Sequence, residues 1–397
     1  MNSFEARRII EALRSGVPSK EVGRFFSDSR KNTLSIVRNN FDKVISENDS
    51  VSLIILGKYG EGKTHMLNTI YNLAHENNMV VSFLSLSKET PLNNLVTIYQ
   101  KLLSSTYLPN RKQPGFIGEF DEKMLDGDFV NDLCNYVRDE LVCDKLYYLL
   151  KTYQKEDDSE KKYLLQSDLL GNFMKVSDLK RFYKSRYEKP MKLNESFVKS
   201  RHINDYISFM SYLFSKMGYN GWVILFDEAE LLGRFARKSR FKAYKNMYYF
   251  LKPDKSLRTV YSVFAFTESY IEEVIEAKND YETINDVYPD DYETIRYVLN
   301  RIIRAHRLPS LNKEEIRGVL MGIVELHEQA YNWESNISLD QLISKCEKSG
   351  FLLRTKLRAA IEYLDQLYQY GDLAEISAGE LKSESYDEDI SFEEVKE

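Results

Sequence analysis

The feature that most constrains this chain is a glycine-rich segment that directly follows an apolar run. Residues 51–56 form the apolar run, and residues 57–64 read GKYGEGKT, which fits the pattern GxxxxGK[ST]. The glycines let such a loop wrap closely around a phosphate, so that backbone N–H groups and the start of the following helix point at the anion. The pattern therefore predicts a phosphate-binding loop. The alternative is a glycine-rich turn with an exposed lysine.

Each residue of the predicted loop has an expected task. Lys63 adds a positive charge at the β and γ phosphates of a nucleotide, and the Thr64 hydroxyl is a ligand for Mg²⁺. We therefore expect ATP and Mg²⁺ as cofactors. The residues expected to hold the nucleotide are Gly57, Lys58, Tyr59, Gly60, Glu61, Gly62, Lys63, Thr64 and His65.

A second apolar run ends in two acids. Residues 222–228 read WVILFDE, and the carboxyl end of a buried parallel strand lies at the sheet edge where the glycine loop also lies. We expect Asp227 to hold Mg²⁺ through water and Glu228 to activate the attacking water. An acidic helix cap is the alternative, and it suits Glu230 better than Asp227. The two motifs in this order predict an ATPase that splits ATP into ADP and phosphate.

Further residues are candidates for roles around the γ-phosphate. Thr267 ends the apolar run 259–266 and is a candidate to orient the water, although an ordinary turn residue fits nearly as well. Transfer of the γ-phosphoryl group spreads negative charge that a guanidinium neutralises, and each arginine is alternatively a solvated surface residue. The arginine candidates are Arg237, Arg240, Arg258, Arg354 and Arg358.

The order of elements predicts an α/β fold. Apolar strands at 51–56, 79–86, 222–226 and 259–266 alternate with helical segments, which favours a parallel sheet with helices on both faces. We expect residues 1–290 to form the nucleotide-binding core, with a large helical insertion at about 108–205. Residues 291–371 read as a helical lid, and residues 372–397 as a disordered acidic tail.

The net charge of −6 is concentrated in that tail. Ten acids and two lysines give residues 372–397 a charge of −8, so the rest of the chain carries about +2, which neither demands nor excludes a nucleic-acid partner. The three cysteines, Cys134, Cys143 and Cys346, are too scattered for a disulfide framework or a zinc site. No apolar run reaches the ~18 residues that span a bilayer, and no secretory signal is visible. We expect a cytoplasmic protein without a membrane partner.

Two basic stretches have two interpretations. Residues 175–201 contain nine lysines and arginines against three acids, and residues 234–245 contain six and no acid. Such stretches suit DNA phosphates, and interleaved aromatic rings suit stacking on bases. They equally suit the solvated faces of amphipathic helices. The aromatic residues in and beside the first stretch are Phe173, Phe182, Tyr183, Tyr187 and Phe197.

Taken together, these motifs resemble the AAA+ branch of P-loop ATPases, and more narrowly the ATP-binding proteins of BREX systems in bacterial phage defence. The narrower resemblance covers roughly residues 3–110 and 220–360, whereas the middle segment carries no such likeness and reads as an elaboration special to this chain. The segments that carry it are EALRSGVP at 11–18, GKYGEGKTH at 57–65, KETPL at 88–92, LFDEAE at 225–230, Ser239-Arg240 and Ala243-Tyr244.

The resemblance implies ATP hydrolysis, homo-oligomers in which an arginine of one subunit reaches a neighbour's nucleotide, and action on DNA beside other defence proteins. By position it makes Thr267 the first sensor and Arg354 the second. We weigh two functions: a DNA-acting ATPase, and a slow nucleotide-gated switch or scaffold for which the helical insertion is a natural docking surface. A kinase fits less well, since Glu228 beside Asp227 suits activation of water.

Overall fold

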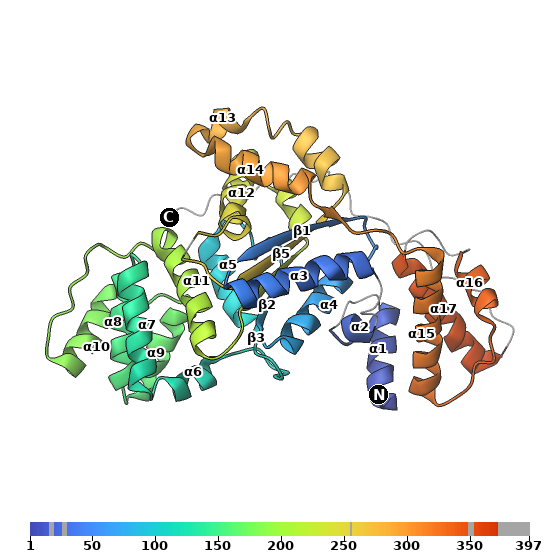
Figure 1. Cartoon of the computed structure of the whole chain (residues 1–397), viewed down its shortest axis with the longest axis horizontal. Helices are drawn as coiled ribbons and strands as arrows, with labels where there is room; N and C mark the ends of the chain where they lie inside the picture. Colours follow the sequence, from blue (N-terminus) through green and yellow to red (C-terminus); the bar gives the residue numbers. More distant parts are fainter. Residues whose placement is uncertain (16–19, 26–29, 255, 348–352, 372–397) are drawn as a thin grey trace.

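A computed structural model describes residues 1–15, 20–25, 30–254, 256–347 and 353–371 (Figure 1). The predicted acidic tail, residues 372–397, lies outside the described residues. Within them, six strands form one sheet in the order β3-β2-β4-β5-β1-β6, and only the β2–β3 pair is antiparallel. The strands are β1 (Val51–Gly57), β2 (Val80–Ser85), β3 (Thr106–Tyr107), β4 (Trp222–Asp227), β5 (Val260–Thr267) and β6 (His306–Arg307). The predicted α/β fold with a parallel sheet is confirmed.

The sheet is buried on both faces, and its strands alternate between two hydrophobic clusters. In β1, Leu53 and Ile55 face one cluster, whereas Ile54 and Leu56 face the other. This is the period of two that a strand imposes, and with both faces covered it produces an uninterrupted apolar run. One face is covered by α3 (Lys31–Glu47) and α4 (Lys63–Glu76). The other is covered by α5 (Leu95–Ser104), α12 (Arg237–Leu251), α14 (Tyr292–Ile303) and the helical insertion.

The predicted insertion is a helical body beside the sheet, drawn in green in Figure 1. Its core is continuous with that of the sheet and contains a buried ion pair between Lys145 and Asp168. The Tyr206 hydroxyl donates to Asp168 at 2.8 Å, so the buried carboxylate has more than one partner. The helices are α6 (Ile117–Lys123), α7 (Gly127–Glu140), α8 (Asp144–Lys155), α9 (Ser159–Leu169), α10 (Val176–Tyr187) and α11 (Lys199–Lys216).

The C-terminal helices form a separate hydrophobic cluster, which we call the lid: α15 (Lys313–Tyr331), α16 (Leu339–Glu347) and α17 (Leu353–Tyr370). The N-terminal helix α1 (Ser3–Ser15) belongs to the same cluster, although the predicted boundaries place it with the core. Figure 1 shows α1 (blue) beside α15 (orange). The next helix, α2 (Lys20–Phe25), packs on α4, and its Val22 also belongs to the lid cluster. We call α1 and α2 the N-terminal arm. Its first helix contacts the lid, and its second contacts α4, the helix that follows the glycine loop.

Short helical elements follow β4 and β5 in the chain. They are the 3₁₀ helix η1 (Ala229–Arg234), the π-helix η2 (Ile271–Glu276), α13 (Ile284–Val287) and the 3₁₀ helix η3 (Pro289–Asp291). Gly57 lies in register with Thr267, and Ser85 with Asp227. Because these four residues end neighbouring parallel strands, their side chains and loops meet at one edge of the sheet. None of the helices in the described ranges is long and apolar enough to cross a membrane.

Candidate nucleotide site

The glycine loop has the backbone conformation that its sequence predicts. Gly60 and Gly62 have φ angles of 74° and 89°, a region that glycine enters without steric cost. Gly62 caps α4, and the Met66 amide donates to the Gly62 carbonyl at 3.0 Å. The N–H groups at a helix start point at a favourable site for an anion.

Lys63 lies inside the loop. Its side chain is buried, and Nζ donates to the carbonyls of Gly57 at 3.1 Å and Lys58 at 3.4 Å. Burial lowers the pKa of Lys63, while the negative charges of nearby carboxylates, Glu230 first among them, act in the opposite direction. The ammonium is thus held where two carbonyl oxygens stand in for the phosphate oxygens of a ligand.

Thr64 and Asp227 face each other across the site. Burial raises the pKa of Asp227, and a hydrogen bond with the Thr64 side chain lowers it. The Glu228 amide also donates to Asp227 Oδ1 at 2.9 Å. A hydroxyl and a carboxylate beside a phosphate loop are the oxygen ligands that Mg²⁺ prefers. These residues therefore fit a nucleotide-bound Mg²⁺, which Thr64 would bind directly and Asp227 through water.

Glu228 is oriented toward the neighbouring strand. Its backbone is left-handed, with φ of 56°, and its carboxylate accepts a hydrogen bond from the Ser85 hydroxyl at 3.2 Å. Ser85 is exposed at the end of β2 and was not predicted as a site residue. The sequence feature that could have indicated Ser85 is a polar residue at the end of an apolar run, because that run forms the strand next to β4. Left-handed backbone costs a non-glycine residue on the order of 1 kcal/mol, so the surroundings hold Glu228 in this position.

A third carboxylate, that of Glu230, lines the cavity that the glycine loop, Asp227 and Glu228 also line. Glu230 lies on η1, and its Oε2 atom is buried without a hydrogen-bond partner among the described residues. Burial raises the pKa of Glu230 to about 7, and the positive charge of Lys63 opposes that shift. The sequence suggested an acidic helix cap for Glu230. The structure places it beside the glycine loop.

The cavity has a polar end and an apolar end. The polar end combines the glycine loop with Asp227, Glu228 and Glu230. Six of the nine predicted nucleotide residues line it; Gly57, Lys58 and Glu61 do not, but their carbonyls fix Lys63 and Arg30. The apolar end is formed by α1, α2, the lid and the segment before it, through Ala12, Leu13, Val22, Leu311, Val319, Leu353 and Leu357.

The two predicted sensors differ in their position. Arg354 lines the cavity from the start of α17, with its guanidinium 5.9 Å from the centre of the Tyr59 ring. Its positive charge lowers the pKa of both Lys63 and Asp227. Thr267 is buried at the end of β5, and the Ser269 hydroxyl donates to Thr267 Oγ1 at 3.4 Å. Thr267 is not among the residues that line the cavity.

Arg30 is a buried residue of the site that was not predicted from the sequence. Its guanidinium donates to the Glu61 carbonyl of the glycine loop and, at 3.0 Å, to the Pro309 carbonyl in the segment before the lid. Its backbone amide lies 3.3 Å from Glu315 Oε1, at the start of α15. Arg30 therefore ties the loop to the lid. No spacing in the sequence indicates a contact between residues this far apart.

One of the arginines proposed to reach a neighbouring subunit, Arg240, forms an ion pair within its own chain. Arg240 is buried, with Nε donating to Asp280 Oδ2 at 2.9 Å and Nη1 to the Phe235 carbonyl at 2.7 Å. Arg240 therefore holds the chain together internally and does not point outward. Arg237 is exposed, Arg358 is half-buried, and Arg258 lies 3.7 Å from Glu140.

The aromatic rings in and beside the first basic stretch are buried or partly buried. Phe182 is buried, and Phe173, Tyr183 and Phe197 pack against the main hydrophobic core. Tyr187 stacks on Tyr183, with ring centres 4.7 Å apart. These rings therefore contribute to the packing of the insertion. Stacking on bases stays a prediction for this stretch.

The parallel sheet with a glycine loop between β1 and α4 defines a P-loop nucleotide-binding protein. The chain belongs to the family described as BREX system ATP-binding protein BrxC/D, whose family model matches residues 2–125 and 145–379. The predicted resemblance is confirmed. The match also includes residues 145–220, so the interpretation of the whole middle segment as special to this chain is wrong. No curated protein and no solved structure matches the chain.

Proposed function

We propose that this protein hydrolyses ATP with Mg²⁺ in the cytoplasm, as the ATPase component of a BREX-like phage-defence system. The family supplies ATP binding and the defence context. The observation that supports hydrolysis is the arrangement of Lys63, Thr64, Asp227 and Glu228 around one cavity. Those residues provide a phosphate-binding cation, oxygen ligands for a metal ion and a carboxylate for water.

In this proposal each end of the cavity has its own role. The apolar end receives the adenine base, and the N–H groups of the glycine loop bind the phosphates. Lys63 exchanges its carbonyl partners for phosphate oxygens. Bound Mg²⁺ supplies positive charge that stabilises the transferred phosphoryl group. Arg354 adds charge from the lid side.

Glu228 takes the proton of the attacking water in this proposal. To do so, its carboxylate leaves Ser85 and turns toward the γ-phosphate. Thr267, in register with the start of the loop, orients the water from β5. The resting hydrogen bond at 3.2 Å thus makes the rotation of Glu228 a step that ligands or partners control.

The second candidate function is a slow nucleotide-gated switch or scaffold. The observation that favours it is the same Ser85–Glu228 contact, because a carboxylate held away from the phosphates gives slow hydrolysis. The helical insertion would then be the docking surface for other defence proteins. Steady-state phosphate release with and without duplex DNA separates the two functions. Strong stimulation by DNA supports the DNA-acting ATPase. Slow turnover that does not change with DNA supports the switch or scaffold.

DNA binding and self-assembly are further parts of the proposal. Exposed cations on α10 support the first, and they include Lys180, Arg181 and Lys184. Assembly into a homo-oligomer requires an arginine that reaches the neighbour's nucleotide. With Arg240 engaged internally, Arg237, Arg258 and Arg358 stay as candidates. Light scattering with and without ATP tests assembly directly.

A further inference from the structure

The N-terminal helix α1 forms one wall of the apolar end of the cavity. Ala12 and Leu13 line it together with lid residues such as Val319 and Leu357. The residues that connect α1 to α2, 16–19, lie outside the described ranges. Helix α1 also packs on α15 and α17 within the lid cluster. The position of this wall therefore depends on how α1 is fixed to the lid.

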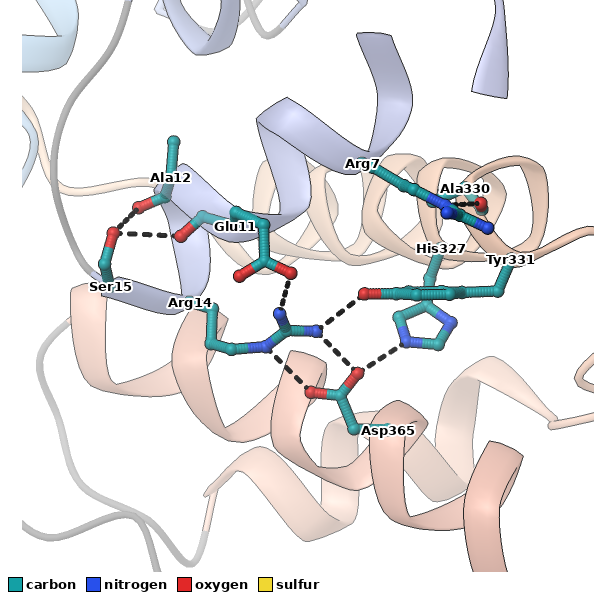
Figure 2. Close-up of polar contacts among 9 residues, drawn as sticks. All are labelled: Arg7, Glu11, Ala12, Arg14, Ser15, His327, Ala330, Tyr331 and Asp365. Atoms are coloured by element: carbon teal, nitrogen blue, oxygen red, sulfur yellow. Dashed lines mark hydrogen bonds and ion pairs between the residues drawn. The ribbon is translucent and has the colours of Figure 1, made fainter. Parts of the chain in front are cut away.

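Arg14, the residue after Leu13, makes the most specific of these contacts (Figure 2). Its Nε donates to Asp365 Oδ2 at 3.0 Å, and its Nη2 donates to Asp365 Oδ1 at 2.7 Å. Nη2 also donates to the Tyr331 hydroxyl at 3.0 Å, and Nη1 pairs with Glu11. A bidentate guanidinium–carboxylate pair fixes orientation as well as distance. We call Arg14, Tyr331 and Asp365 the clasp.

Asp365 is itself held in place from the lid. Trp333 Nε1 donates to His327 Nδ1 at 3.0 Å, and His327 Nε2 lies 3.0 Å from Asp365 Oδ1. Because an indole nitrogen only donates, Nδ1 accepts, and Nε2 carries the proton that points at Asp365. Burial raises the pKa of Asp365, but hydrogen bonds from His327 and Arg14 hold it below its ordinary value. The carboxylate that Arg14 binds is therefore ionised, and His327 helps to orient it.

We propose that Arg14 is a positioning residue for the adenine base: by clasping Asp365 it holds Ala12 and Leu13 against the base and so sets the affinity for ATP. The inference rests on the proposed function, since it requires ATP in this cavity. The inference gives α1 and α17 a joint role in nucleotide binding, through Arg14 and Asp365, which are 351 positions apart in the chain.

Arg7 supplies a matched control on the same helix. Its Nε donates to the Ala330 carbonyl at 2.7 Å, and its guanidinium lies 5.5 Å from the centre of the Tyr331 ring. Arg7 therefore also links α1 to α15, but it does not line the cavity and is two turns away from Leu13. Figure 2 shows both arginines approaching the lid from α1.

The experiment compares Arg14→Ala with Arg7→Ala in the full-length protein, using Mg-ATP and inorganic triphosphate as ligands. Triphosphate occupies the phosphate end alone. Arg14→Ala should weaken ATP binding about five- to tenfold, or about 1–1.4 kcal/mol, because Ala12 and Leu13 are then no longer fixed against the base. It should leave triphosphate affinity within about twofold and raise KM for ATP while kcat stays near the wild-type value. Arg7→Ala should change neither affinity, and Arg14→Lys should fall between wild type and Arg14→Ala.

Two outcomes overturn the proposal: unchanged ATP affinity in Arg14→Ala, or equal weakening of ATP and triphosphate, which makes the clasp a general support of the lid. The melting temperature of each variant, measured without nucleotide, identifies a variant that is not folded. In that case Asp365→Asn, which retains the side-chain volume, takes the place of Arg14→Ala with the same expected result. A wild-type protein that binds neither ligand contradicts the proposed function itself and is thereby distinguished from failure of the clasp.

Discussion

In the proposed mechanism, the hydrogen bond between Ser85 and Glu228 restrains the carboxylate that activates water. Ser85 is exposed, so its hydroxyl is replaced by water once the side chain is removed. A hydrogen bond of this kind contributes about 0.5–1.5 kcal/mol. We therefore expect Ser85→Ala to raise basal ATP turnover about two- to tenfold.

Ser87→Ala is the control, since the Ser87 hydroxyl contacts Glu89 and Thr90. Steady-state phosphate release at saturating ATP is the measurement. A fall in turnover in Ser85→Ala would show that Ser85 assists the reaction and does not restrain Glu228.

Glu230 predicts a pH dependence of stability. Burial raises its pKa to about 7, above the usual value of about 4.3 for glutamate. The folded protein thus binds a proton that the unfolded chain releases, so this group lowers stability as pH rises from about 4.3 through 7. In nucleotide-free protein, Glu230→Gln should raise the melting temperature by a few degrees at pH 8 and by less at pH 5.

Thermal unfolding at both pH values tests this expectation, with Glu228→Gln, an exposed carboxylate, as the control. A stabilisation by Glu230→Gln that is the same at both pH values would show that the carboxylate does not titrate in this range.

Some site residues follow from the sequence and others do not. Lys63, Thr64 and Asp227 stand at fixed spacings that the chemistry of phosphate and Mg²⁺ requires. Ser85 and Arg30 reach the site through strand register and a long-range contact, which no local pattern encodes. The predicted roles of Thr267 and Arg354 stay predictions.

At the scale of elements, the long buried strands were predictable and the short edge strands were not. The apolar runs at 51–56 and 222–226 match β1 and β4 closely, because burial on both faces leaves a continuous pattern. In β3 and β6 each strand has two residues, too few to show any period. The apolar face of α1 packs on the lid, and an apolar face alone does not reveal which element covers it.

The helix α10 carries the prediction on DNA. Lys180, Arg181 and Lys184 are exposed, whereas Arg186 pairs with the buried carboxylate of Glu156. Changing the three exposed residues together to Ala should weaken DNA binding and reduce the slope of log affinity against log salt by up to ~0.9 for each DNA phosphate that is no longer neutralised. Basal ATP turnover should survive.

Binding of a fluorescent duplex and of a single strand at several salt concentrations is the measurement. Arg186→Ala is the contrasting variant, expected to lower the melting temperature without a comparable change in slope. Unchanged affinity and slope in the triple variant would remove α10 as a DNA contact.

At the scale of the whole molecule, one cavity lies where separate parts of the chain meet. The sheet edge supplies the glycine loop and the carboxylates, and the lid with α1 supplies the apolar end. Arg30 joins the two through the carbonyls of Glu61 and Pro309. Nucleotide binding is therefore expected to stabilise the lid, the arm and the core together. The sequence predicted the parts, but their assembly around the cavity depends on contacts between distant segments.

The central claim is that this cavity hydrolyses ATP, and the most direct test is to separate binding from hydrolysis in one variant. Glu228→Gln should bind Mg-ATP with near wild-type affinity while turnover falls by about 10² or more, the usual effect of losing a general base. Lys63→Ala, the binding control, should lose affinity for ATP because the cation at the phosphates is gone. ATP binding and phosphate release are measured on the same preparations. Wild-type turnover in Lys63→Ala, or a Glu228→Gln protein that no longer binds ATP, would contradict the account.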